Sequence, residues 1–404
     1  MKILQLCIKP PFPPVDGGTM AMNGITQGLL EAGCEVRVLS VCSDKHPVLR
    51  NQMTDEYVER THFEAVKLDL TPHPVDAFVA LLCGESYHVT RFVSKKFESR
   101  LVEILGEERF DVVHLESVFL TPYVEVIRKH SDAKIVMRAH NVEHQIWQRI
   151  AKREGNPLKR WYLKRLALSL AYYEREHAGD YDGVVCITEQ DGRFFGQNTR
   201  KPVEAIPFGV LCPEPIKNVE AEPMSLFHIG SMDWMPNEEG VRWFLKEVWP
   251  RLHEELPGVK LYLAGRKMPA DLMEMKMDGV RVVGEVEDAA YFIASKQINV
   301  VPLLSGSGIR VKIIESMSLG KPVVSTTIGA QGIRCVDGKN ILVADSPEEF
   351  VAQVRRCVED AEFCRELGEN AYRLIATEYD NGVLTRRLLD FYGRLGVESE
   401  DCGQ

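Results

Sequence analysis

The run VVPLLSGSGIRVKIIESMSLGKPVVST, residues 300–326, carries more structural information than any other part of this 404-residue chain. Its first apolar residues and the run PVVS near its end are typical of two buried strands. The amphipathic segment between them predicts a helix over 308–319. Strand, glycine turn, helix and strand in this order form the repeating unit of a parallel α/β sheet.

The glycine turn in this run is a candidate anion site. Gly306 and Gly308 form the turn, and Arg310, Lys312 and Glu315 follow on the first two turns of the predicted helix. Free N–H groups and the helix dipole attract anions to a helix start, and glycine allows the anion to approach closely. Two cations here oppose the dipole, so we interpret the anion as the diphosphate of a nucleotide-sugar. An ordinary turn with solvated Arg and Lys is the alternative.

Composition indicates a globular chain of two domains. A length of 404 residues exceeds what one core usually supports, and 45% hydrophobic with 27% charged residues is typical of a globular protein. The net charge of −10 argues against nucleic acid as a partner. Ten cysteines without a CxxC pair indicate reduced thiols in the cytoplasm. The chain has no run of 18 apolar residues, so no membrane span is predicted. Four prolines within residues 10–14 argue against a signal peptide.

Short β-rich runs alternate with helical segments along the whole chain, which predicts a doubly wound α/β fold. The proline-rich stretch 211–223 has no apolar periodicity and reads as a linker. We therefore expect a first domain over 1–210, a second over 224–380, and a last helix over about 381–395 that packs back on the first domain. Ligands bind outside the carboxyl ends of the strands in such sheets.

Glu315 and the run Gly320-Lys321-Pro322-Val323-Val324 resemble a motif of the family 4 retaining glycosyltransferases. This family has the GT-B fold, with two Rossmann-like doubly wound domains facing across a cleft. Its motif is a glutamate pair spaced E-x7-E, followed by A-x-G-x-P-V. The resemblance implies that Glu315 binds the nucleotide ribose. Ser307 stands where the family has the first glutamate, which contacts the donor sugar, so the chain departs from the pattern there.

The resemblance extends to 228–237, HIGSMDWMPN, at the start of the second domain. The family often holds the diphosphate with an Arg and a Lys near this loop, and Arg310 and Lys312 are expected to replace that pair. Asn237 itself is expected to cap the helix that follows. The donor-binding residues that the resemblance implies are Gly17, Gly18, Gly230, Ser231, Arg266, Gly284, Gly306, Ser307, Gly308, Ile309 and Glu315.

In the first domain, the resemblance implies that the histidine after the strand KIVMRA, His140, lies near the donor sugar. His140, Arg310 and Lys312 are thus the candidate catalytic residues. Glu116, Asn141 and Glu143 are candidates on the acceptor side. Gly17 and Gly18 follow the first strand, and their alternative reading is a tight turn.

Two patterns resemble metal sites. His140, Glu143 and His144 have the spacing of an inverse zincin motif but straddle a strand-to-helix turn. Asp180-Tyr181-Asp182 is a DxD sequence, the metal motif of the other major glycosyltransferase fold, yet it precedes a strand instead of following one. We expect it to be a surface turn and predict neither a metal nor a cofactor.

The segment 149–175 carries eight Arg or Lys residues interleaved with large apolar ones, in an otherwise acidic protein. Such a segment suits contact with an anionic membrane. A solvated helix with its apolar stripe on the core is the alternative.

The function implied by the resemblance is transfer of a sugar, with retained configuration, from a UDP- or GDP-sugar to a hydroxyl of a glycan or lipid-linked glycan. Surface polysaccharide assembly in the cytoplasm, at the inner face of the cell membrane, fits this reading. A nucleotide-sugar 2-epimerase of the same fold and a non-catalytic nucleotide-sugar-binding subunit are the alternatives, the second because of Ser307.

Overall fold

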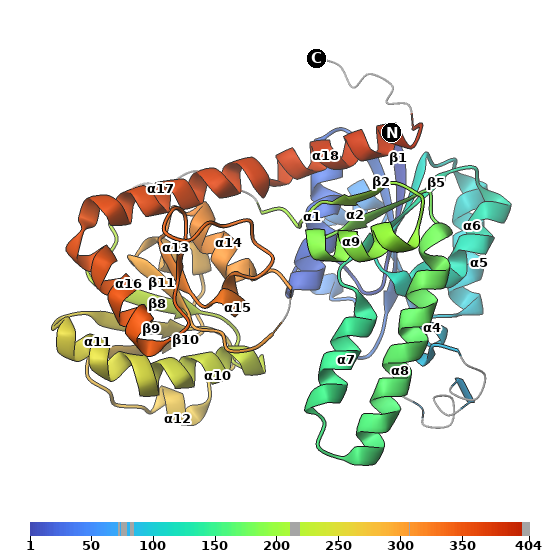
Figure 1. The fold of residues 1–404 in the computed structure, drawn as a ribbon. Helices are drawn as coiled ribbons and strands as arrows, with labels where there is room; N and C mark the ends of the chain where they lie inside the picture. Colours follow the sequence, from blue (N-terminus) through green and yellow to red (C-terminus); the bar gives the residue numbers. More distant parts are fainter. Residues whose placement is uncertain (72, 74–78, 81–84, 211–218, 307, 398–404) are drawn as a thin grey trace. The chain divides into compact units, whose positions relative to one another are not determined.

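The computed structural model describes residues 1–71, 73, 79–80, 85–210, 219–306 and 308–397 (Figure 1). The chain divides into two compact units. The first consists of Met1–Gly209 with Asn381–Gln404, and the second of Val210–Asp380.

The first unit is built on a seven-stranded parallel sheet of order β3-β2-β1-β4-β5-β6-β7. Its strands are β1 (Lys2–Cys7), β2 (Glu35–Cys42), β3 (Glu64–Lys67), β4 (Val112–Leu115), β5 (Lys134–Ala139), β6 (Gly183–Cys186) and β7 (Val203–Ala205). Its helices are α1 (Gly17–Glu31), α2 (Asp55–Thr61), α4 (Tyr87–Thr90), α5 (Lys95–Glu107), α6 (Val124–His130), α7 (Glu143–Arg153), α8 (Pro157–Glu176), α9 (Glu189–Asn198) and α18 (Asn381–Arg394). The strand order reverses between β1 and β4, which places a ligand crevice at their carboxyl ends.

The second unit is built on a six-stranded parallel sheet of order β10-β9-β8-β11-β12-β13, which reverses between β8 and β11. Its strands are β8 (Ser225–Ile229), β9 (Lys260–Ala264), β10 (Val280–Gly284), β11 (Ile298–Val301), β12 (Val323–Ser325) and β13 (Leu342–Val343). Its helices are α10 (Met235–Trp243), α11 (Trp249–Glu255), α12 (Ala270–Met273), α13 (Ala289–Ala294), α14 (Val311–Ser318), α15 (Thr327–Ala330), α16 (Pro347–Glu359) and α17 (Ala361–Glu378). The two sheets confirm the predicted doubly wound α/β class.

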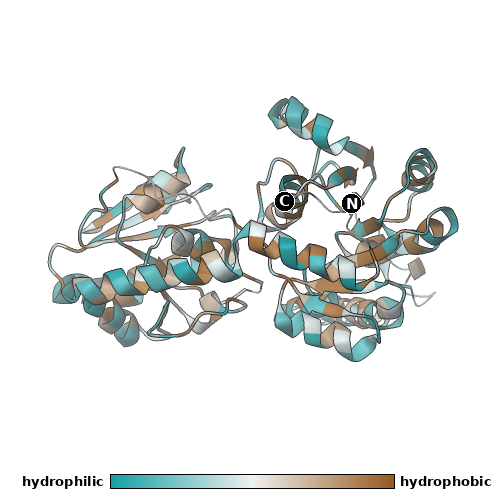
Figure 2. Cartoon of the chain, turned by 90° about the horizontal axis from the view of Figure 1, so that it is seen from above, coloured by the Kyte–Doolittle hydropathy of each residue, from teal (hydrophilic) through white to brown (hydrophobic). Residues whose placement is uncertain are grey.

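Each sheet is buried on both faces. In β1, Leu4 and Leu6 pack into one apolar cluster while Ile3 and Cys7 pack into another, as the two-residue period of a strand requires. The helices over these faces alternate teal and brown in Figure 2, because each has one buried and one exposed side.

Helix α18 completes the first unit by packing on α1. A Cβ on Gly28 would lie 2.0 Å from Thr385 Oγ1, so glycine at this position lets the two helices approach closely. The Asn381 amide also donates to the Gly24 carbonyl over 2.9 Å. The last helix thereby becomes part of the first unit.

The prediction that helix α14 begins at Gly308 is wrong. Gly306 and Gly308 have φ of +117° and +83°, in the left-handed region, and Arg310 is extended as the N-cap of α14. The helix therefore begins only at Val311, so Arg310 lies before it and Lys312 lies in its first turn.

Candidate functional site

The Arg310 side chain packs against the glycine turn after β11. This side chain is 4% exposed, and its Nη1 donates to the Gly308 carbonyl over 2.6 Å. Its guanidinium also lies 5.4 Å from the centre of the Trp234 ring. A Cβ on Gly306 would lie 3.0 Å from Arg310 Nη2 and 3.2 Å from Trp234, so the turn fits closely over both side chains. The Arg310 side chain thus shapes the turn by holding the backbone carbonyl of Gly308. Ser307 lies outside the described residues.

Lys312 joins the turn to the end of β8. Its Nζ donates to Asn237 Oδ1 over 2.5 Å and lies 3.3 Å from His228 Nε2. Burial, with a smaller effect of the nearby Arg310, lowers the pKa of Lys312 to about 7. The two partners of Lys312 Nζ are neutral. An anion beside Nζ would therefore favour the charged ammonium form of this side chain.

His228 and Asn237 hold the Lys312 side chain in place, and these contacts could not be predicted from the sequence. His228 Nδ1 lies 2.8 Å from the Val300 carbonyl, to which it donates, so its Nε2 lone pair faces Lys312. Burial, with Lys312 beside it, lowers the pKa of His228 well below its ordinary value and keeps the ring neutral. The expectation that Asn237 caps a helix is wrong: Trp234 is the N-cap of α10, and the buried Asn237 amide bridges Lys312 and the Ser231 carbonyl.

Gly230 is required by this packing. A Cβ there would lie 2.4 Å from Lys312 Nζ and 2.8 Å from Asn237 Nδ2. A Cβ on Gly265, at the end of the neighbouring strand β9, would lie 1.8 Å from the Gly230 carbonyl oxygen. Both glycines are therefore needed for the close packing of backbone and side chains at the carboxyl edge of this sheet.

Glu315 lies one turn after Lys312 on α14 and is half-buried. Burial raises the pKa of its carboxyl, while Lys312 acts in the opposite direction. Among the described residues, its carboxylate makes no hydrogen bond or ion pair. A half-buried carboxylate with this much free hydrogen-bonding capacity is suited to two vicinal hydroxyls.

The remaining donor-side candidates lie along the same edge. Gly284 ends β10 with φ +76°, and its carbonyl accepts from the Gly265 amide over 2.7 Å. The Ser231 hydroxyl donates to Asp233 over 2.6 Å, a turn contact. Arg266 is exposed at the end of β9, and Ile309 is half-buried beside the turn. Apart from Ser307, the structure thus places the predicted second-unit residues near the carboxyl ends of β8 to β11.

In the first unit, the tight-turn alternative for Gly17 and Gly18 is wrong, because both begin α1. Asp16 is the N-cap and forms a capping box with Thr19. Lys9 pairs with Asp16 over 2.7 Å, and a Cβ on Gly18 would lie 3.1 Å from Lys9 Nζ. The start of α1 therefore presents backbone N–H groups next to a cation at the carboxyl end of β1.

His140 is held by a fully buried carboxylate. Its Nε2 lies 2.9 Å from Glu116 Oε2, and its side chain is 16% exposed. Burial opposes ionisation of Glu116, but Arg138 and His140 outweigh it and lower the pKa of this carboxyl to about 2. Burial also lowers the pKa of His140, so its ring is neutral at pH 7 and donates Nε2–H to Glu116. The Nδ1 lone pair then remains for a substrate.

Glu116 is held in turn by residues from three other elements. Gln5 of β1 donates to Glu116 Oε1 over 2.7 Å. Arg138 of β5 lies 3.5 Å from Oε2 and donates to the Ala21 carbonyl over 2.8 Å. His114 lies 3.5 Å from Oε1 and shares a 2.6 Å hydrogen bond with Tyr392 of α18. Glu116 is therefore part of a buried polar network, and none of its partners could be predicted from the sequence.

A second polar group lies next to His140 in the sequence and includes Asn141 and Glu143. The Glu143 amide donates to Glu174 over 2.7 Å, and His144 Nδ1 lies 2.6 Å from the same carboxylate. Burial and the charge of Glu174 raise the pKa of Glu143 to about 8, against a hydrogen bond from Asn141. At pH 7 the Glu143 carboxyl is mostly protonated and can donate to a hydroxyl.

Both metal-like patterns have other partners. Asp180 pairs with His177 over 2.6 Å, and Asp182 pairs with Arg128 over 2.7 Å. In the part of the chain that the structure describes, no group of three His, Cys, Asp or Glu side chains could hold a metal ion.

Comparison with known proteins assigns both units. Residues 223–360 match the family model described as glycosyl transferases group 1, and residues 15–211 match that of glycosyltransferase family 4. A 44.6 kDa protein of the cps region of Klebsiella pneumoniae is 26% identical over 393 residues, covering 94% of this chain and 97% of that protein.

Solved structures show the same fold at low sequence identity. Sucrose-phosphate synthase from Thermosynechococcus elongatus has a TM-score of 0.69 at 15% identity, covering 99% of this chain and 100% of that one. Anabaena Alr3699/HepE in complex with UDP has 0.64 at 14%, covering 98% and 100%. Staphylococcus aureus TarM with fondaparinux, α-GlcNAc-glycerol and UDP has 0.64 at 12%, covering 97% and 100%.

Proposed function

The chain belongs to the family 4 glycosyltransferases of group 1 and has the GT-B fold, and we propose that it transfers a sugar from a nucleotide diphosphate sugar to an acceptor hydroxyl with retention of configuration. The observation that carries the proposal is that Lys312 and the unpaired carboxylate of Glu315 lie on successive turns of α14 beside the glycine turn at the carboxyl edge of the second sheet, among the described residues.

In this proposal the second unit holds the donor. The backbone N–H groups at the start of α14 and the Lys312 ammonium bind the diphosphate. Glu315 accepts hydrogen bonds from the ribose hydroxyls, and Gly230 and Gly284 let the nucleotide approach the backbone. As the sugar leaves, Lys312 stabilises the charge that develops on the phosphate.

In the first unit, His140 receives a sugar hydroxyl on Nδ1 while Glu116 fixes the ring through Nε2. The protonated Glu143 offers a donor to the acceptor. Retention then requires no side-chain nucleophile, since a phosphate oxygen takes the proton of the attacking hydroxyl and the protein mainly positions the reactants. No metal ion enters this proposal.

The relatives support a donor and acceptor class. HepE of Anabaena has been crystallised with UDP and with UDP-glucose, and TarM with UDP and α-GlcNAc-glycerol. The Klebsiella relative is a protein of the cps region. We propose a UDP-sugar as donor, before a GDP-sugar, and a glycan or lipid-linked glycan of a surface polysaccharide as acceptor.

A panel of UDP-, GDP- and ADP-sugars tests the donor site. At a hundred times its Kd, the right donor is expected to stabilise the protein by about 2.7 kcal/mol. The measurement is thermal unfolding of the wild type and of Glu315→Ala in parallel, with Glu285→Ala as a control in an exposed carboxylate of the same unit. Loss of the shift in Glu315→Ala alone supports the ribose role.

No shift with any donor would contradict the donor site. Turnover of the donor without an acceptor, to an epimerised sugar, would favour the epimerase alternative. Donor binding without turnover in the presence of lipid-linked glycans would favour the binding subunit.

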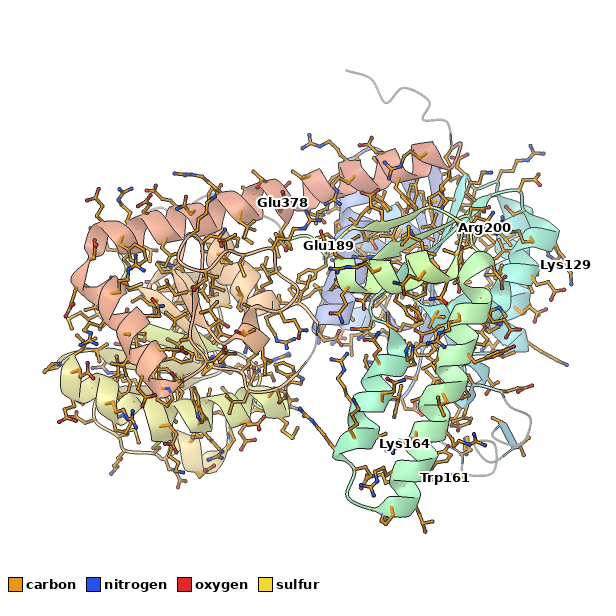
Figure 3. The ribbon with its side chains drawn as sticks, in the orientation of Figure 1. Lys129, Trp161, Lys164, Glu189, Arg200 and Glu378 are labelled. Carbon is orange, nitrogen blue, oxygen red and sulfur yellow. The ribbon has the colours of Figure 1, made fainter. Side chains whose placement is uncertain are left out.

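A lipid-linked acceptor would lie at a membrane surface, and we propose that the hairpin of α7 and α8 contacts an anionic membrane. Among the described residues, no helix is long and apolar enough to span a bilayer. In the hairpin, Leu163 and Leu166 are buried, whereas Leu158, Trp161 and Leu168 are 80%, 54% and 57% exposed. Figure 3 shows Trp161 and Lys164 toward the end of the hairpin that is remote from the sheet. The hairpin also carries these exposed cations: Lys152, Arg153, Lys159, Arg160, Lys164 and Arg165.

Removal of Trp161 is expected to weaken vesicle binding about tenfold, since an interfacial aromatic ring contributes about 1–2 kcal/mol of apolar burial. Sedimentation with phosphatidylglycerol-containing vesicles measures this for Trp161→Ala. Tyr291→Ala is the matched control, because Tyr291 is similarly exposed, at 56%, in the second unit. Equal binding to neutral phosphatidylcholine vesicles, or equal losses in both variants, would contradict the proposal.

A further inference from the structure

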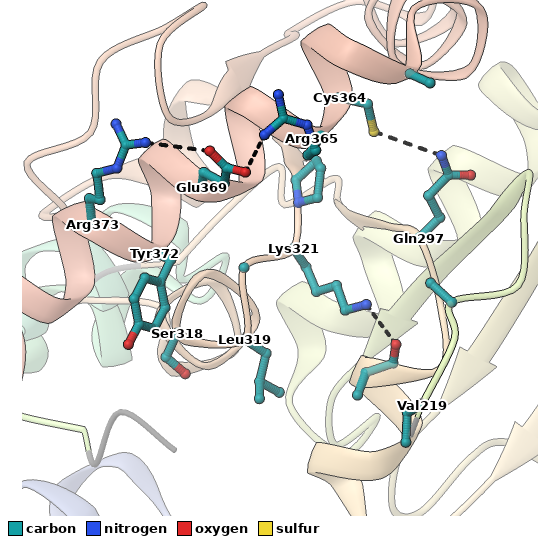
Figure 4. A pocket seen from close by; sticks show the side chains of 15 residues that line it. Val219, Gln297, Ser318, Leu319, Lys321, Cys364, Arg365, Glu369, Tyr372 and Arg373 are labelled. Atoms are coloured by element: carbon teal, nitrogen blue, oxygen red, sulfur yellow. Dashed lines mark hydrogen bonds and ion pairs between the residues drawn. The ribbon is translucent and has the colours of Figure 1, made fainter. Parts of the chain in front are cut away.

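The second unit contains a cavity at the edge of its sheet opposite the glycine turn that follows β11. Gln297 directly precedes β11, and Lys321 and Pro322 directly precede β12, so the cavity lies at the amino ends of these strands. The first turns of α17 close its other side (Figure 4). Its volume is about 700 Å³, enough for a small organic molecule.

Positive charge in the cavity wall exceeds negative charge. Arg365 and Arg373 both pair with the single carboxylate of Glu369. Lys321 donates from Nζ to the Ala294 carbonyl over 2.6 Å, and within the described ranges it has no ion pair. Burial lowers the pKa of Lys321 to about 8, so the ammonium still carries its charge for most of the time at pH 7.

The rest of the wall is largely apolar. Val219, Ala221, Leu319 and Pro322 line the cavity, and the Tyr372 ring stands at its side. Cys364 also lines it, with Sγ 3.8 Å from Gln297 Nε2. An inorganic ion would leave this apolar surface uncovered, whereas an organic anion would use both the charge and the apolar wall.

We propose that this cavity is a binding site for a small organic anion, whose charged group pairs with Lys321 and whose apolar or aromatic body lies between Leu319 and Tyr372. The site lies at the end of α14 remote from Lys312, because Ser318 and Leu319 of its carboxyl end line the cavity. It is therefore separate from the donor site and does not depend on the proposed function.

A purely structural role of Lys321 is the competing explanation. Ala294 ends α13, and a lysine can cap the free carbonyl groups of a helix end. That role predicts a loss of stability when Lys321 is removed, without any binding of anions.

Fluorescence titration of the full chain with 1-anilinonaphthalene-8-sulfonate, an aromatic sulfonate, tests the proposal. We expect saturable binding at one site, and at least tenfold weaker binding of the neutral N-phenyl-1-naphthylamine. Lys321→Met is expected to lose at least tenfold in affinity for the sulfonate, whereas the control Lys246→Met, a highly exposed lysine of the same unit, is expected to lose none. Equal affinity for the charged and neutral probes would overturn the proposal.

A second measurement on the wild type does not depend on how the variant folds. The sulfonate is expected to slow alkylation of Cys364 by iodoacetamide severalfold, measured peptide by peptide, and to leave Cys335 unchanged, because Cys335 does not line the cavity. Unchanged alkylation of Cys364 at saturating probe would overturn the site. If the Lys321→Met variant unfolds earlier but binds the sulfonate normally, Lys321 only caps the end of α13, and its proposed role in binding is overturned. Donor binding is expected to persist in this variant, so the two proposals fail independently.

Discussion

Raising the pH from 6.5 to 8.5 is expected to weaken donor binding about twentyfold in the wild type. Burial lowers the pKa of Lys312 to about 7, so the free protein loses this proton over that range. A diphosphate beside the ammonium favours the charged form, so the complex keeps the proton. Each pH unit above the pKa of the free group then costs about tenfold in affinity. The sign is fixed by the lysine, because the doubly esterified diphosphate has no proton to lose here.

Lys312→Met is the informative comparison for this prediction. It is expected to bind the donor weakly at every pH and to show no slope, so that the two affinity curves converge near pH 8.5. Isothermal titration with the donor found in the panel measures both. Lys312→Met retains His140, whose pKa burial lowers, so any slope caused by that ring would also appear in the variant. A wild-type affinity that is flat over this range would contradict a role of Lys312 in holding the diphosphate.

The donor side of this site could be predicted because its residues lie close together in the sequence. Gly306, Gly308, Lys312 and Glu315 fall within one strand–turn–helix unit, and a local pattern is enough to place them. The start of α14 was misplaced by the same reasoning, since periodicity does not register that two glycines are held at positive φ. Asn237 was misread because a cap is a local role, while its observed partner, Lys312, is 75 residues away.

The buried network beneath His140 could not have been predicted. Glu116 meets Gln5 across 111 residues, and His114 meets Tyr392 across 278 residues. The order of the strands, which brings β1, β4 and β5 side by side, sets these contacts. A single sequence gives the class of such a sheet from its pattern, but not which polar side chains meet inside it.

Replacing Glu116 by Gln is expected to lower the free energy of unfolding by about 3–5 kcal/mol, the usual result of removing one partner of a buried ion pair. Both Glu116 and Arg138 are 0% exposed, and this pair is the one ion pair of Arg138 in the described residues. The glutamine keeps the shape and can still accept from Gln5. What it loses is the charge, so the Arg138 guanidinium would remain in the interior without an opposite charge.

A double variant separates this explanation from simple loss of packing. Glu116→Gln combined with Arg138→Met removes both charges and is expected to recover most of the loss, because the penalty arises from one unpaired buried charge. Urea unfolding measures all three proteins, with Glu125→Gln as the control, since the exposed pair of Glu125 with Lys129 contributes about 0.5 kcal/mol. If Glu116→Gln costs no more than this control, Arg138 is compensated by something other than Glu116. The Glu116 charge would then not hold this buried network together, and its proposed role in positioning His140 for sugar transfer would fall with it.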